Sequence, residues 1–258
     1  MGALNQDPYE ELAEIVRKES GIVLKPEHAN SVRAKLQPLA EHWGLRGVDE
    51  LIARMRRERH NPTVMEEVLN ALTIKETSFF RDQTPFRVLK SRILPELAHA
   101  NPNRPLKLWS AACSTGQEAF TLAMVLAEHA RGPWEILGTD VSTRVVRTAQ
   151  QGIYAMEQAK NIPKRYLHAC CLKGVGNRAG TFRMDRPLRE RVHFSHANLQ
   201  EELSRLGKFD LIMLRNVLIY FDQRSKHRVV TNVLRQLKPG GWLMVGHAES
   251  LSGMSEGL

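Results

Sequence analysis

Two segments of this chain could together bind a nucleoside. The first is Ser110-Ala111-Ala112-Cys113-Ser114-Thr115-Gly116-Gln117-Glu118, whose small side chains allow a ligand to approach the backbone closely. The second is Asp140, which lies 24 residues after Gly116, a distance typical of a carboxylate that accepts both hydroxyls of a ribose. Asp140 could instead cap a helix before Ser142. The turn lacks Gly-x-Gly-x-x-Gly and Gly-Lys-Ser/Thr, so an adenosine without a pyrophosphate fits it better.

Three further segments follow or precede apolar runs. Asn198 and Leu199 offer a polar side chain for the edge of an adenine ring and an apolar wall for its face. Arg215 and Asn216 leave the apolar run 209–214. The turn Lys238-Pro239-Gly240-Gly241, placed between a helical segment and an apolar strand, is typical of methyltransferases that use S-adenosylmethionine.

These residues must be positioned by a parallel sheet. Apolar runs that predict strands alternate with segments of helical periodicity, which indicates an α/β fold with a doubly wound, Rossmann-like sheet covered on both faces. The expected strands are 106–111, 134–139, 192–195, 209–214 and 242–246, and the expected helices are 118–131, 142–151 and 223–237. Ligands bind such sheets beyond the carboxyl ends of the strands, where the candidate residues lie.

The chain divides into unequal parts. Residues 1–75 have only helical periodicity and predict a small N-terminal all-helical domain, in which Asp49 could cap one helix. Residues 76–105 are expected to form a linker and a connecting helix, and residues 106–258 the cofactor-binding domain. Glycine spacing and short β-like runs within about 160–191 predict an inserted antiparallel β lobe.

Composition restricts the functional class. The formal net charge is +9, yet residues 1–75 sum to −1 and residues 160–192 to +7, which indicates an acidic partner or a solvated basic face. The sequence contains no uncharged apolar stretch of about 18 residues, so no transmembrane helix is predicted, and the first residues lack a signal-peptide pattern. Three cysteines, of which Cys170 and Cys171 are adjacent, predict neither a disulfide framework nor a zinc site and fit a reducing cytoplasm.

Several long motifs, in one order along nearly the whole chain, resemble the CheR family of bacterial chemotaxis receptor methyltransferases. They are Leu72-Thr73-Ile74-Lys75-Glu76-Thr77-Ser78-Phe79-Phe80-Arg81-Asp82, Trp109 to Glu118, Gly138 to Ser142, Leu214 to Phe221 and Gly246-His247-Ala248-Glu249-Ser250. The resemblance implies a class I methyltransferase sheet and methyl transfer from S-adenosylmethionine to glutamate carboxylates on the cytoplasmic helices of chemoreceptors. S-adenosylhomocysteine would be the product, and chemotaxis adaptation the process.

The resemblance also implies roles for particular residues. It places cofactor contacts at Lys75, Thr77, Arg81, Ala112, Glu118, Asp140, Asn198, Leu199, Arg215 and Asn216. The family usually has Asn where this chain has Lys75, so the backbone is the expected contact there. It places a catalytic pair at Arg81 and Tyr220, which could orient the substrate carboxylate; Arg81 could instead hold the cofactor's own carboxylate, and Tyr220 could be a packing residue. Because a glutamate has a reference pKa of about 4.3, it is ionised at neutral pH and needs no general base.

Two surfaces could bind the receptor. Family members use a basic helix of the small domain to face the receptor. The corresponding segment here, 32–39, has few arginines, and the arginines of the next helix could compensate or be solvated. Segment 173–183 resembles the lobe of family members that bind a peptide at the receptor's C-terminus. The implied peptide contacts are Gly174, Gly176, Gly180 and Arg183. An extended peptide would add to an edge strand, and Arg183 would meet an acidic group.

The alternatives are a methyltransferase for nucleic acid or a small molecule, and a catalytically silent peptide-binding adaptor. The segment after residue 214 lacks the Pro-Pro-aromatic motif of amino-group methylation, and the adaptor would not need the intact candidate residues. We expect a cytoplasmic protein, recruited to membrane-bound receptor arrays, with no metal, no nucleic acid and no membrane insertion. The chain stops before the antiparallel strand pair that such sheets usually add, so we expect a longer natural protein.

Overall fold

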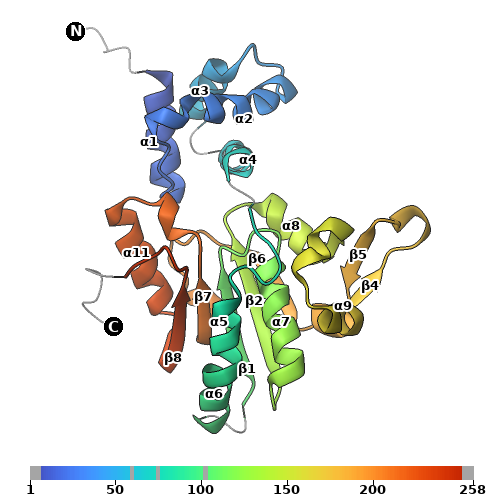
Figure 1. The fold of residues 1–258 in the computed structure, drawn as a ribbon. Coiled ribbons are helices and arrows are strands. Elements are labelled where there is room, and N and C mark those ends of the chain that lie inside the picture. Colours follow the sequence, from blue (N-terminus) through green and yellow to red (C-terminus); the bar gives the residue numbers. More distant parts are fainter. Residues whose placement is uncertain (1–6, 59–60, 74–75, 101–103, 252–258) are drawn as a thin grey trace.

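The computed structural model describes residues 7–58, 61–73, 76–100 and 104–251. A domain of helices lies over one end of a sheet that has helices on both faces (Figure 1). The sheet ends that face the helical domain are the carboxyl ends of its strands, where the candidate residues lie. The two parts of the chain therefore meet at the predicted site.

The helical domain is built from four helices with clear sequence signals at their ends. They are α1 Pro8–Ser20, α2 Ala29–His42, α3 Val48–Arg57 and α4 Pro62–Leu72. Asp7 and Asn61 cap α1 and α4, which each begin with proline, and Gly21 ends α1 in the left-handed region at φ 77°. The prediction that Asp49 caps a helix is wrong. Gly47 is the N-cap of α3, and Asp49 lies in its first turn, paired with Arg33.

A run of helix without a strand connects the domains. It consists of α5 Gln83–Val88, a π-helical stretch at Leu89–Ile93 and α6 Leu94–Ala100. The sequence predicts this segment as one helix, which the structure resolves into three. Its buried residues, including Phe86, Leu89 and Ile93, join the core on one face of the sheet.

The main sheet has five parallel strands in the order β6-β2-β1-β7-β8. Its strands are β1 Leu106–Ala111, β2 Trp134–Asp140, β6 Val192–His196, β7 Phe209–Leu214 and β8 Leu237–Val245, and its connecting helices include α7 Gln117–His129, α8 Thr143–Gln151 and α11 Gln223–Leu234. The doubly wound, Rossmann-like arrangement is confirmed. The strand order reverses between β1 and β7, so the switch point lies beside the turn after β1.

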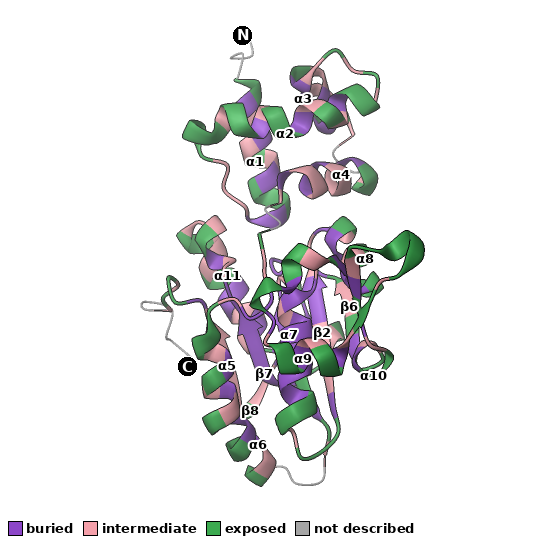
Figure 2. Cartoon of the chain, turned by 45° about the vertical axis from the view of Figure 1, so that its right-hand side comes forward, coloured by how far each residue is buried: buried purple, intermediate pink, exposed green. Residues whose placement is uncertain are grey.

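Alternation along the central strands supplies both layers of the core. Leu108, Leu211 and Met213 pack with α7 and the connecting helices, whereas Trp109 and Ile212 pack with α11. Figure 2 shows these strands as the most buried part of the molecule. Every residue of β7 is buried, which is why its sequence reads as a continuous apolar run interrupted only by Asp210.

The inserted lobe is a three-stranded antiparallel sheet in the order β3-β5-β4. Its strands are β3 Ile153–Ala155, β4 Cys171–Lys173 and β5 Thr181–Met184, accompanied by α9 Lys164–Cys170 and α10 Arg186–Arg189. The predicted antiparallel lobe is thus present, and its first strand begins before residue 160. Phe79, Tyr154 and Phe182 form a ring cluster that packs the lobe against the linker.

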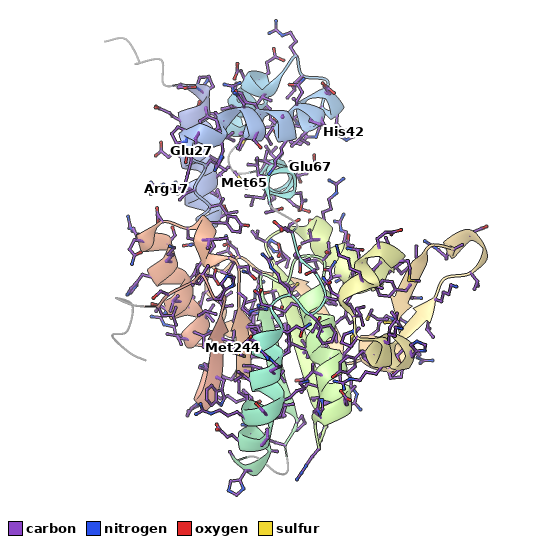
Figure 3. The ribbon with its side chains drawn as sticks, in the orientation of Figure 1. Arg17, Glu27, His42, Met65, Glu67 and Met244 are labelled. Atoms are coloured by element: carbon purple, nitrogen blue, oxygen red, sulfur yellow. The ribbon has the colours of Figure 1, made fainter. Side chains whose placement is uncertain are left out.

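Several contacts hold the helical domain onto the sheet domain, and two groups of them involve side chains of α1 and α4. Near the end of α1, Arg17 lies 3.3 Å from the Asp222 carboxylate that caps α11, and Figure 3 labels this arginine. Beneath α4, the Asn70 side-chain oxygen accepts from the Ser142 hydroxyl at 2.5 Å and from the Arg144 amide at 3.2 Å. Asn70 therefore bonds to the first turn of α8, immediately after Asp140.

Candidate active site

A cavity of about 670 Å³ lies at the carboxyl ends of the strands, between the two domains. This volume suits a nucleoside-sized ligand. The structure brings the sequence-predicted residues together there. Those that line the cavity are Thr77, Arg81, Ala112, Glu118, Asp140, Asn198, Leu199, Arg215, Asn216 and Tyr220. Lys75 lies outside the described residues.

The Asp140 carboxylate is fixed by backbone amides. Its two oxygens accept from the Ser114 amide at 2.9 Å and from the Ser142 amide at 3.0 Å. Each oxygen keeps an acceptor site for a ligand. Burial raises the pKa of Asp140 above its ordinary value, and the two amides act in the opposite direction. Ser142, rather than Asp140, accepts from the Val145 amide at the start of α8, so helix capping does not require Asp140.

A buried network holds Arg215 and Glu118. Arg215 has a side chain only 1% exposed, and it donates to Glu118 at 2.9 Å and to Asp82 at 3.0 Å. Ser110 donates to the other Glu118 oxygen at 2.7 Å. Burial raises the pKa of Glu118, whereas Arg215 and Ser110 lower it. The Arg215 guanidinium thereby joins the end of β7 to the linker and to α7, and Glu118 extends the network to β1.

Three polar atoms of this site have no protein partner. Within the described residues, the Thr73 hydroxyl, the Ser114 hydroxyl and Arg215 Nε are buried without a hydrogen bond. All three residues line the cavity, as does Asp140 with its spare acceptor sites. Buried polar groups usually have partners, so unpaired ones at a cavity indicate a polar ligand. A ligand that offers ribose hydroxyls to Asp140 fits these residues.

The backbone around the cavity occupies an uncommon region. Ala112, Ser114 and Asn216 have φ values of 62°, 50° and 58°, although none is glycine. Phe80 and Asp82, on either side of Arg81 in the linker, are also positive, both at 53°. Non-glycine residues with positive φ concentrate at ligand sites, because strain there is retained only where surrounding contacts fix it.

Arg81 and Tyr220 lie on the same cavity. Arg81 donates to the Glu76 carbonyl at 2.9 Å, which curls the linker around its guanidinium. Burial raises the pKa of Tyr220, and the positive charge of Arg81 lowers it. Tyr220 therefore keeps its proton at neutral pH and can donate a hydrogen bond.

The Asn198 side chain has partners that the sequence did not indicate. Its amide nitrogen donates to the Glu19 carbonyl at 2.6 Å, and its oxygen accepts from the Gln200 amide at 3.0 Å. Asn198 thus ties the end of α1 to the loop after β6. Only Leu199, beside it, keeps the apolar character expected of a wall for a base.

Sequence reasoning missed the contribution of the helical domain. The cavity is lined by Ser20, residues 22–25 and His28, and by Lys35 and other residues of α2. The Val23 amide donates to the Tyr220 carbonyl at 2.9 Å, and Ile22 forms a β-bridge with Phe221. These contacts join residues almost 200 positions apart. No local motif marks them, although the apolar run Ile22-Val23-Leu24 between two helices was a possible signal.

The cavity contains a cysteine with no chemical role in view. Cys113 is buried, and burial raises the pKa of its thiol well above the ordinary value. A protonated, buried thiol is a poor nucleophile. Within the described residues, no cluster of three or more His, Cys, Asp or Glu side chains could hold a metal ion.

The Lys238-Pro239-Gly240-Gly241 turn lies at the opposite end of the sheet. It bulges out between the pairs Phe209–Leu237 and Leu211–Trp242, at the amino end of β7. Lys238 donates to the buried Asp210 carboxylate at 2.8 Å, and a Cβ at Gly241 would lie 2.9 Å from the Lys238 carbonyl oxygen. This turn therefore serves the packing of β8 and does not touch the cavity.

The predicted peptide residues lie in the lobe. A Cβ at Gly174 would come within 2.0 Å of the Arg178 carbonyl oxygen, while Gly176 and Gly180 have φ values of 56° and 80°. Backbone geometry thus explains all three glycines. Arg183 is exposed on β5, the central strand of the lobe, and not on an edge strand. The edge strand β4 is followed by Val175, which is 78% exposed.

The parallel sheet, the acid at the end of β2 and the cavity at the switch point define a class I methyltransferase that uses S-adenosylmethionine. Comparison with known proteins identifies the family. Residues 7–73 match the all-alpha domain of CheR methyltransferases, and residues 75–258 match their S-adenosylmethionine-binding domain. The chain belongs to the CheR family, and its cofactor is S-adenosylmethionine.

Relatives extend over nearly the full chain. Chemotaxis protein methyltransferase 1 of Pseudomonas aeruginosa is 36% identical over 99% of this chain and 94% of its own length. Cher2 of Pseudomonas putida is 33% identical over 96% of this chain and 92% of its own. The Escherichia coli chemotaxis protein methyltransferase is 31% identical over 97% and 86%. This protein is thus a methyltransferase of chemotaxis adaptation. No helix among the described residues is long and apolar enough to cross a membrane.

Proposed function

We propose that this enzyme methylates glutamate side chains of a chemoreceptor cytoplasmic domain, forming methyl esters. The observation that carries the proposal is the pairing, on one cavity, of a ribose-type acceptor at Asp140 with Arg81 and a protonated Tyr220. A guanidinium and a phenol suit the two oxygens of a carboxylate. The arrangement favours a protein carboxylate over a nucleic-acid base, which would be an amine or carbon nucleophile.

The residues would divide the work as follows. Asp140 would hold the ribose, Leu199 one side of the base, and Thr77, Ala112 and Asn216 the surrounding backbone wall. Glu118 and Arg215 would present fixed charges to the amino and carboxylate groups of the cofactor. When bound, S-adenosylmethionine supplies an electrophilic methyl group on a sulfonium. The proposed cofactor contacts also include Lys75, Arg81 and Asn198.

The substrate carboxylate would accept the methyl group in one displacement. A carbon–oxygen bond forms while the carbon–sulfur bond breaks, and the electron pair of the latter stays on sulfur. No proton is transferred, so a general base is unnecessary. Arg81 and Tyr220 would aim one carboxylate oxygen along the line of attack, and a cavity closed by both domains would exclude water from a step in which opposite charges neutralise.

The lobe would bind a receptor tail peptide. Gly174, Gly176 and Gly180 shape the connection between β4 and β5, and exposed Arg183 would meet an acidic side chain or a terminal carboxylate. The charge of residues 160–192 supports an acidic peptide. Binding of a tail would raise the local concentration of enzyme near the receptor and place a cytoplasmic protein at membrane-bound receptor arrays.

We further propose a division of the chain into domains. We assign residues 1–75 to the helical domain, 76–105 to the linker and 106–258 to the methyltransferase domain. The two family models meet between residues 73 and 75, which supports the first boundary.

The test is transfer from methyl-labelled S-adenosylmethionine to a receptor cytoplasmic fragment with and without its C-terminal peptide. Label that alkali releases as methanol identifies a carboxyl methyl ester. Loss of transfer without the peptide supports tail binding by the lobe. Alkali-stable label, or label that enters RNA and not the receptor, contradicts the proposal.

A further inference from the structure

The carboxylate of Glu249 accepts four backbone hydrogen bonds. Its oxygens lie 2.8 Å from the Asn216 amide, 2.8 Å from the Val217 amide, 2.7 Å from the Leu218 amide and 2.8 Å from the Gly246 amide. Three of these amides belong to consecutive residues after β7. One side chain, 31 to 33 residues away in sequence, thus fixes the start of that loop.

The loop has few other means of holding this shape. Asn216 is in the left-handed region, and Val217 then begins the short 3-10 turn Leu218–Tyr220, which has no side-chain cap of its own. Without Glu249, the three amides would lose their acceptor at a partly buried position. Buried or half-buried amides without partners are costly, so the loop would rearrange.

Sheet topology brings Glu249 to this loop. β7 and β8 are parallel neighbours, and the pair Leu214–Val245 ends both strands at the same level. The turn after β8, in which the Glu249 amide donates to the Gly246 carbonyl at 2.9 Å, therefore lies against the loop after β7. Gly246 leaves room for it, because a Cβ there would lie 2.5 Å from the Glu249 carboxylate.

The loop after β7, which Glu249 fixes, forms part of the cavity wall. Asn216, Val217, Ile219 and Tyr220 all line it. Glu249 itself is not among the lining residues, so it acts through the residues that it holds. Tyr220 is additionally held from the other domain by the Val23 amide.

We infer that Glu249 is a positioning residue for methyl transfer, which holds Asn216 against the cofactor and Tyr220 against the substrate carboxylate. This inference rests on the proposed function of the cavity. It assigns to the segment after β8 a role that its sequence does not suggest.

The experiment compares Glu249→Gln and Glu249→Asp with the wild-type enzyme. Glutamine keeps the size of the side chain, but its amide group offers one acceptor oxygen to four donors. Glu135→Gln is the matched control, because Glu135 lies near the amino end of β2, where it pairs with Lys107 at 2.6 Å. For each variant we would measure the melting temperature, the affinity and stoichiometry for S-adenosylhomocysteine, and turnover on the receptor fragment.

Turnover per cofactor-binding site is the decisive quantity. A residue that only stabilises the fold would lower the melting temperature and the number of binding sites, but not turnover per site at saturation. We expect Glu249→Gln to lose at least about tenfold in turnover per site, Glu249→Asp to lose less, and Glu135→Gln to match the wild type. Turnover per site within twofold of wild type in Glu249→Gln would overturn the inference.

A second variant covers the case in which Glu249→Gln does not fold. Gly246→Ala keeps the Glu249 carboxylate but adds a methyl group that would lie 2.5 Å from it, so the carboxylate must move away from the amides that donate to it. The same loss of turnover per site is expected, and unchanged turnover would contradict the inference. A wild-type enzyme that binds the cofactor but methylates no receptor would instead refute the proposed function.

Discussion

Replacing Asp140 by asparagine should weaken cofactor binding without unfolding the protein. Each carboxylate oxygen already accepts one backbone amide, so each has one remaining acceptor site for a ribose hydroxyl. Asparagine retains the shape but replaces one acceptor by a donor. A hydrogen bond to a charged group contributes about 1.5–3 kcal/mol, which corresponds to a dissociation constant roughly 10- to 150-fold higher.

Isothermal titration with S-adenosylhomocysteine measures this directly, with Glu135→Gln as the control for loss of an exposed carboxylate. The stoichiometry should stay at one, and the melting temperature of the ligand-free protein should fall moderately, because the Ser114 or the Ser142 amide then faces a nitrogen donor instead of an acceptor. If Asp140→Asn bound the ligand within threefold of wild type, Asp140 would not hold the ribose.

Acidification should weaken binding in the wild type by the same route. Burial raises the pKa of Asp140, so the carboxylate takes up a proton at a higher pH than its ordinary value of 3.8. Ribose binding is complete above the raised pKa and is lost as the pH falls through it. The folded state also binds this proton more readily than the unfolded state, so this group favours folding more as the pH falls. Affinity measured from pH 7 downward should decline less steeply in Asp140→Asn.

Three further predictions concern other parts of the molecule. Tyr220→Phe should lower turnover on the receptor about 10-fold or more while S-adenosylhomocysteine affinity stays the same, as kinetics and titration would show; equal turnover would make Tyr220 a packing residue. Asp210→Ala should lower the free energy of unfolding in urea by about 1–3 kcal/mol, because it removes the buried carboxylate that accepts hydrogen bonds from Arg104, Lys238 and the Lys107 amide. Burial acts to raise the pKa of Asp210, yet its hydrogen bonds hold it below 3.8, so this stabilisation exists above that value and is lost as the pH falls. Gly174→Ala should abolish binding of a receptor tail peptide without affecting cofactor affinity. Unchanged peptide binding would mean that the lobe is not the binding site of the tail.

Local signals were enough for the parallel sheet. β1, β2 and β7 are short apolar runs bounded by polar or small residues, and each lies where its run predicts. The candidate cavity could also be predicted in large part, because the carboxyl ends of parallel strands meet at one edge. The residues after β1, β2 and β7 then gather without any knowledge of distant contacts.

What the sequence could not indicate depends on contacts between distant segments. Glu249 belongs to a motif that marks the family, but its structural role is not apparent until β8 is paired with β7. Asn198 has the chemistry to contact a base, but its partner is a carbonyl at the end of α1. The role of segment 20–25 likewise depends on how the helical domain is seated on the sheet, which no periodicity predicts.

The position of the cavity between the two domains implies that a bound ligand affects how firmly the domains dock. Because both domains supply walls to one cavity, a ligand in it binds the docked arrangement and not the separated one. At 100 times its dissociation constant, such a ligand adds about 2.7 kcal/mol to the docked state. S-adenosylmethionine and its product should therefore stabilise the docked arrangement of the two domains. The melting temperature of the chain should rise with the concentration of either ligand.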